Sequence, residues 1–74
     1  MDTLTDTRET IKRLERATAA RARCQTRVTH FTVKAGQAAT DAGRAEWTDL
    51  RDEARRLRDA WDEEIRGIRR DLLG

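Results

Sequence analysis

The sequence predicts an all-α fold, an antiparallel two-helix hairpin of the coiled-coil type that occupies residues 1–74 as one domain. Apolar and small residues recur at steps of three and four in both halves of the chain, which is the spacing of one helix face. The chain has no Pro and only 4 Gly, which argues against a turn-rich β fold. A segment of small and capping residues, 36–43, interrupts the pattern near the middle and supplies a turn.

The first helix is expected at about residues 6–37. Asp6 is a suitable N-cap, and Glu9 stands three residues later, where it can reach back to the cap. The helical stripe that follows consists of Leu14, Ala17, Cys24, Val28, Phe31, Ala35 and Ala38. Residues 26–33 are rich in Thr and Val, so a strand there remains a less favoured alternative.

The turn is expected at about residues 38–43 and the second helix at about 44–73. This second helix has one narrow apolar stripe that runs to the C-terminus. Its members are Trp47, Leu50, Ala54, Leu57, Trp61, Ile65, Ile68 and Leu72.

Charge divides unevenly between the two halves. Residues 1–37 contain eight Lys/Arg and four Asp/Glu, hence +4, whereas residues 38–74 contain eight and ten, hence −2. An antiparallel pairing places the basic flank of the first helix beside an acidic flank of the second. This alignment predicts three pairs across the hairpin: Lys34 with Glu46, Arg27 with Glu53, and Arg21 with Glu64.

A lone hairpin exposes half of each apolar stripe, although burial of a Trp or Leu side chain is worth roughly 1.5–3 kcal/mol. We therefore expect a protein partner or a homo-oligomer. One arrangement is a parallel self-pair of the second helix that joins Glu46 to Arg51 and Glu53 to Arg58 of another copy. The expected contact residues are Trp47, Leu50, Leu57, Trp61, Ile65 and Ile68.

Nothing in the sequence predicts catalysis. His30 and Cys24 are the only residues of their types, and neither has neighbours at metal-ligand spacing. Cys24 falls on the apolar stripe, which favours burial as a small apolar side chain. We expect no catalytic residue, no metal and no cofactor, and hence a protein that is not an enzyme.

The expected function is that of a small assembly subunit, such as a structural component of a phage particle or of a comparable multi-chain complex. Small size, composition and the lack of catalytic motifs are the grounds for this expectation. The sequence has no apolar run near the ~20 residues that span a bilayer, and its start lacks a secretory signal. We therefore expect no membrane partner and a place in the cytoplasm or within a virion.

A nucleic-acid-associated regulator is the less favoured alternative. A basic row on the first helix lies within about 60° and extends over about 33 Å, so that it could follow a phosphate backbone. The row consists of Lys12, Arg16, Arg23, Arg27 and Lys34, together with His30. Against this alternative, the formal charge of the chain is only +2, and no aromatic residue alternates with the cations to stack on bases.

Overall fold

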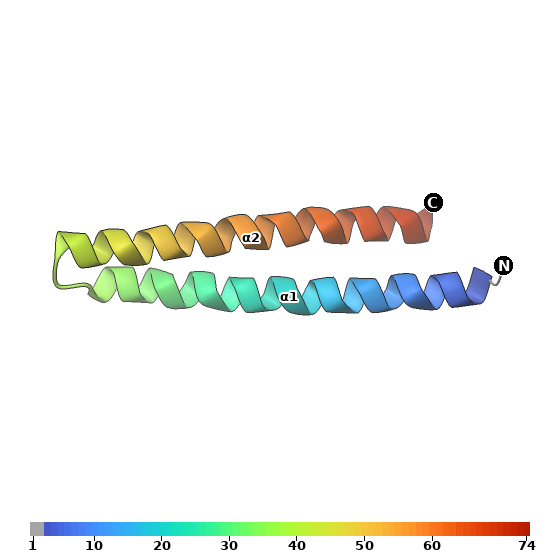
Figure 1. The fold of residues 1–74 in the computed structure, drawn as a ribbon, viewed down its shortest axis with the longest axis horizontal. Coiled ribbons are helices and arrows are strands. Elements are labelled where there is room, and N and C mark those ends of the chain that lie inside the picture. The colour runs from blue at the N-terminus through green and yellow to red at the C-terminus, as the bar shows by residue number, and fades with distance from the viewer. Residues whose placement is uncertain (1–2) are drawn as a thin grey trace.

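The computed structural model describes residues 3–74, with side chains from residue 4 onward, while residues 1–2 of the predicted domain lie outside the described residues. Two helices, α1 (Thr3–Gln37) and α2 (Asp41–Leu73), run antiparallel with a short turn between them (Figure 1). They form a rod of 59 × 15 × 14 Å. The predicted all-α helical hairpin is confirmed.

The start of α1 differs from the prediction. The helix begins at Thr3 and not at Asp6, which lies inside the first turn. There the carbonyl oxygen of Asp6 accepts a hydrogen bond from Oγ1 of Thr10 at 2.9 Å. A carboxylate in the first turn interacts favourably with the positive end of the helix dipole. The same residue therefore suits either position, and its identity alone does not locate the start.

The strand alternative for residues 26–33 is wrong, because this segment is helical throughout. Thr26, Thr29 and Thr32 each donate the side-chain hydroxyl to the carbonyl oxygen four residues earlier, at 3.1, 3.1 and 2.7 Å. Their β-branched side chains thereby satisfy their polar groups on the helix itself. Val28 of the same segment is buried against α2, so tertiary packing outweighs the local preference for a strand.

The turn is shorter than predicted, with residues 38–40 between the helices in place of 38–43, so that α2 begins at Asp41. Thr40 is the N-cap of α2, with φ −125 and ψ 155, and its Oγ1 accepts a hydrogen bond from the backbone N–H of Gly43 at 3.0 Å. The carbonyl oxygen of Thr40 accepts from the backbone N–H of Arg44 at 3.0 Å. This cap starts the helix earlier than the apolar pattern does.

The core is a single seam in which mostly small side chains of α1 meet larger side chains of α2. The buried residues of α1 are Ala17, Ala20, Cys24, Val28 and Ala35, and those of α2 are Ala54, Ile65 and Ile68. Leu14 and Trp61 pack against the cluster of Ala17, Ile65 and Ile68. Closer to the turn, the rings of Phe31 and Trp47 lie 5.9 Å apart. The seam thus extends along most of the rod.

Loss of the cap at the turn should destabilise the hairpin. Thr40→Ala removes the acceptor for the Gly43 N–H, which should lower the free energy of unfolding by about 0.5–2 kcal/mol. Thermal unfolding followed by circular dichroism measures this as a fall in Tm of about 4–8 °C per kcal/mol. Thr40→Ser keeps the acceptor and serves as the control. Equal Tm values for the Ala variant and the wild type would contradict the assignment of this cap.

A glycine inside α2 should be replaceable with a gain in stability. A Cβ added at Gly67 would meet only the guanidinium of Arg70, at 3.9 Å, which is ordinary contact. Gly67→Ala should therefore raise the free energy of unfolding by about 0.5–1 kcal/mol through the smaller entropy of the unfolded chain. The control is Gly43→Ala, whose Cβ would lie 3.1 Å from Oγ1 of Thr40, the capping atom. A lower Tm for Gly67→Ala than for the wild type would show that this backbone position is constrained.

Candidate interaction surface

The apolar stripe of α2 is only partly covered by α1. Ile65 and Ile68 are buried, whereas Leu50 is 42% exposed and Leu57 is 46% exposed. Leu50 and Leu57 are seven residues apart, so they lie on the same side of the helix, two turns from each other. The hairpin therefore leaves a leucine ridge uncovered at one edge of its seam.

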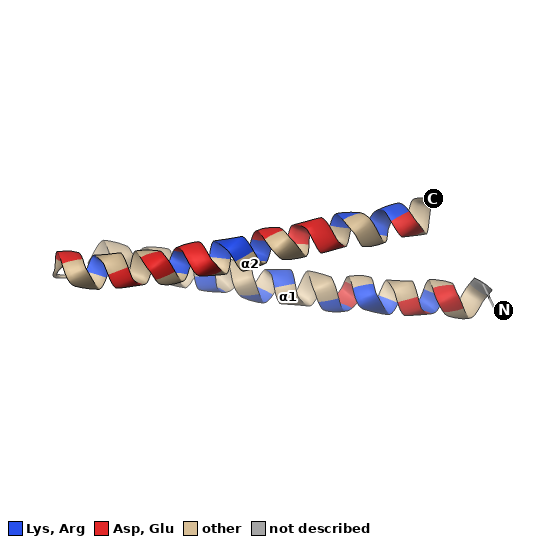
Figure 2. Cartoon of the chain, turned by 45° about the horizontal axis from the view of Figure 1, so that its top comes forward, with Lys and Arg blue, Asp and Glu red and all other residues tan. Residues whose placement is uncertain are grey.

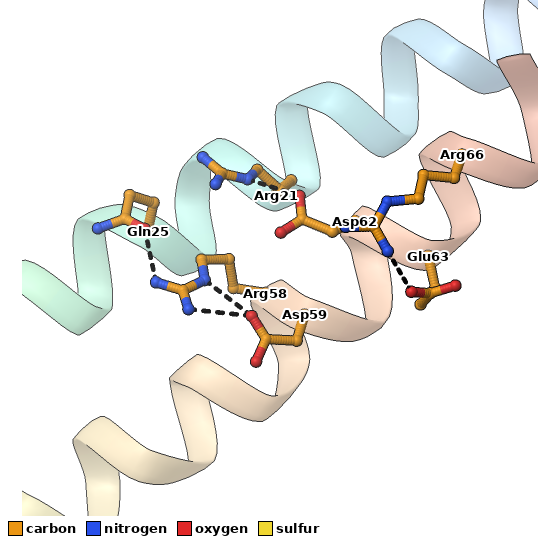
Figure 3. Close-up of polar contacts among 7 residues, drawn as sticks. All are labelled: Arg21, Gln25, Arg58, Asp59, Asp62, Glu63 and Arg66. Carbon is orange, nitrogen blue, oxygen red and sulfur yellow. Dashed lines mark hydrogen bonds and ion pairs between the residues drawn. The ribbon is translucent and has the colours of Figure 1, made fainter.

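Arg51 and Arg58 stand at the opposite edge of the α2 stripe, and their side chains are only 26% and 22% exposed. Each guanidinium is held at 2.9 Å by the aspartate that follows it, Asp52 or Asp59. Arg58 also donates through Nη1 to Oε1 of Gln25 on α1, at 3.0 Å (Figure 3). These contacts engage both arginines within the hairpin, and the self-pairing through Arg51 and Arg58 stays a prediction.

The leucine ridge borders an open groove between the helices, which we call the Leu57 groove. Three adjoining hollows form it: the first shares Leu57 with the second, and the second shares Trp61 and Glu64 with the third. The residues that line it are Arg13, Arg16, Ala17, Arg27, Phe31, Leu50, Glu53, Ala54, Leu57, Ala60, Trp61, Glu64 and Ile68. The groove is apolar along its floor and charged at both edges.

The two edges of the Leu57 groove carry opposite charge. The charged residues that line it from α1 are Arg13, Arg16 and Arg27, and those from α2 are Glu53 and Glu64. Arg13 and Glu64 form an ion pair across the groove at 3.1 Å. Among the described residues no ion pair within 4.0 Å involves Arg16, Arg27 or Glu53.

Two of the observed contacts correct the predicted charge pairing. Arg21 does not face Glu64; its Nε donates to Oδ1 of Asp62 at 2.9 Å (Figure 3), and Glu64 pairs with Arg13. Lys34 with Glu46, and Arg27 with Glu53, form no ion pair in the described part of the chain, although Arg27 and Glu53 line the same hollow. Asp62, the observed partner of Arg21, lies on the flank of α2 opposite to that of Glu64.

The structure divides the predicted contact residues into three groups. Ile65 and Ile68 belong to the hairpin core and present little surface to a partner, whereas Trp47 and Trp61 are half-buried. Leu50 and Leu57 are the predicted contact residues that remain well exposed. Phe31 and Ala60 also line the groove, although the sequence pattern does not predict them as contact residues. Both residues lie beside the leucine ridge because of the way in which α2 is turned towards α1, and the sequence alone does not give this orientation.

The basic row on α1 is accessible and mostly unengaged. Arg16, Arg23 and Arg27 are exposed, Lys34 is half-buried, and within the described chain no ion pair involves any of these four. Lys12 lies 3.6 Å from Glu9 on its own helix. Figure 2 shows that the acidic residues of α1 are confined to its N-terminal part, while acidic and basic residues alternate along α2. The row is free to meet an acidic group on another molecule.

The remaining candidate side chains have structural neighbours. Cys24 is buried and free, as its place on the apolar stripe predicts. The ring of His30 contacts Phe31, with centroids 5.6 Å apart, and meets Trp47 edge-on at 6.4 Å. Among the described residues no group of three or more His, Cys, Asp or Glu is placed to hold a metal ion. Within the same residues, neither helix contains a span apolar and long enough to cross a membrane.

No family model matches the chain, and no curated protein or solved structure matches it either.

Proposed function

We propose that the protein is a non-enzymatic assembly subunit that contacts a protein partner through the Leu57 groove. The observation that carries this proposal is the leucine ridge, because Leu50 and Leu57 are nearly half exposed in the middle of a helix whose Ile65 and Ile68 are buried. A ridge of this kind beside a charged rim is typical of a protein–protein contact surface. Covering it would remove apolar surface from water at about 25 cal/mol per Å².

The shape of the hairpin supports the same proposal. A compact monomer of this mass would expose about 4,700 Å² of surface, whereas the hairpin exposes 5671 Å². Its radius of gyration is 17.0 Å, against about 11 Å for a compact domain of this length. The excess arises because two helices share only one seam, and a further layer of helix would remove it.

The proposal also covers the assembly and the compartment in which the protein acts. An elongated hairpin with charged flanks suits coiled-coil packing in a multi-chain assembly, such as the structural part of a phage particle. In this role the protein acts in the cytoplasm or within a virion, and it supplies binding surface without catalysis.

Phosphate binding by the α1 row is the competing function. The exposed and unengaged Arg16, Arg23 and Arg27 favour it. However, Glu53 and Glu64 line the same groove as Arg16 and Arg27, so a polyanion bound there would lie beside carboxylates. Such repulsion lowers the affinity for nucleic acid, and we therefore favour a protein partner.

The decisive measurement is the solution mass by size-exclusion chromatography with light scattering, at low and moderate salt, without and with duplex DNA. The wild type should exceed the monomer mass under all four conditions. Leu50→Gln combined with Leu57→Gln should return the mass toward the monomer, because glutamine keeps helix propensity but removes the apolar ridge. Helicity by circular dichroism should be retained in this variant, since both leucines lie outside the core cluster.

The matched control is Val33→Gln, which changes another exposed apolar residue, 51% exposed, outside the groove. Its solution mass should equal that of the wild type. A mass that changes only with DNA at low salt would replace the assembly proposal with the phosphate-binding alternative. If the wild type is monomeric, the wild type and the leucine double variant are each used to capture binding proteins from cells of the source, and the two sets of captured proteins are compared. Retention of the same proteins by both would contradict a role for the groove.

A further inference from the structure

We propose that a second copy of this chain occupies the Leu57 groove, in a two-fold dimer whose axis runs parallel to the rod, with both turns at the same end. This inference rests on the proposed function and names the partner of that same surface. The dimer is a four-helix bundle in which α1 of each copy lies over α2 of the other.

Charge selects this arrangement among the symmetric ones. Two rods that meet face to face can be related by a two-fold axis along the rod or by one across it. An axis across the rod stacks α1 on α1 and sets Arg16 and Arg27 against the same residues of the other copy. An axis along the rod places them over the partner's acidic edge, which contains Glu53 and Glu64. Only the second arrangement is electrostatically favourable.

The contacts follow from the positions along the rod. Arg27 and Glu53 line the same hollow, so they stand at the same height on opposite edges of the groove. A two-fold axis along the rod preserves height and exchanges the edges. Each Arg27 therefore meets the Glu53 of the other copy, and the contact occurs twice. Leu50 and Leu57 enter the shared interior of the bundle beside Phe31 of the other copy.

The charges and the area of this face suit a second copy. Arg27 and Glu53 make no ion pair within the described hairpin, so both remain available. One long face of a 59 × 15 Å rod has a projected area of about 900 Å², and a stable interface needs about 800 Å² from each partner. One face of the hairpin is therefore large enough for a dimer.

Charge reversal at the groove edges tests both the partner and the axis. The wild type should have a solution mass of about 17 kDa, twice the 8.5 kDa of one chain. Arg27→Glu alone and Glu53→Arg alone each place like charges at both contacts, and each should raise the dimer dissociation constant about tenfold or more. An equimolar mixture of the two variants restores opposite charges at both contacts and should form a heterodimer with wild-type affinity.

The mixture distinguishes an interface effect from a folding defect, because a variant that merely fails to fold cannot be rescued by another chain. Arg56→Glu makes the same charge change at an exposed position outside the groove and should leave the dissociation constant unchanged. Circular dichroism of each variant verifies that the hairpin is helical.

Three outcomes would overturn the inference. Tighter dimerisation of Arg27→Glu would indicate an axis across the rod. A dimer that ignores both single reversals would place the interface elsewhere. A wild type that stays at 8.5 kDa up to millimolar concentration has no self-association. In the last case the dimer inference fails, but the proposed function holds if the wild type captures a protein from cells that the Leu50→Gln, Leu57→Gln variant does not capture. The failure of the dimer and the failure of the proposed function are therefore distinguishable.

Discussion

The angular position of the apolar stripe around the axis of α2 is the constraint on which the rest of the structure depends. The central line of the stripe repeats every seven residues: Trp47, Ala54, Trp61 and Ile68. Leu50 and Leu57 lie to one side of this line and Ile65 to the other, about 60–80° apart around the helix axis. The seam between two paired helices is narrower than this band. The hairpin buries Ile65, and the leucine ridge is exposed as a consequence.

The small side chains of α1 explain how the hairpin can bury the Ile65 side of the α2 stripe. Ala17 packs with Ile65 and Ile68 in one cluster, and short side chains along α1 leave room for the larger ones of α2. The same rotation brings Arg51 and Arg58 to the flank of the seam, where the neighbouring aspartates hold their guanidinium groups. Hydrophobic burial therefore decides the rotational position of α2, since ion pairs with partly exposed partners at the surface are individually worth only ~0–1 kcal/mol.

The helices, their antiparallel order and the approximate turn could be predicted because periodicity and small residues are local signals. The rotational position of α2 about its own axis could not be predicted, because the apolar stripe covers a range of angles and several orientations bury part of it. Arg21 shows the consequence: its predicted and observed partners, Glu64 and Asp62, are two residues apart and so about 200° apart around the helix. The observed ion pair of Arg21 therefore lies on the flank of α2 opposite to the predicted one. The exposed leucines of the candidate surface became identifiable only when that flank was known.

The uneven charge of the two halves gains a physical meaning from this geometry. A nucleic acid presents one sign of charge, and it would be attracted to α1 but repelled by the Glu53 and Glu64 edge of the same groove. The groove has a basic edge on α1 and an acidic edge on α2. A complementary surface has the edges exchanged, so that it places an acidic edge against the first and a basic edge against the second. A two-fold axis along the rod makes this exchange with the chain's own copy, and no second protein is needed to supply it. The apolar floor then provides the affinity and the charged edges provide the orientation.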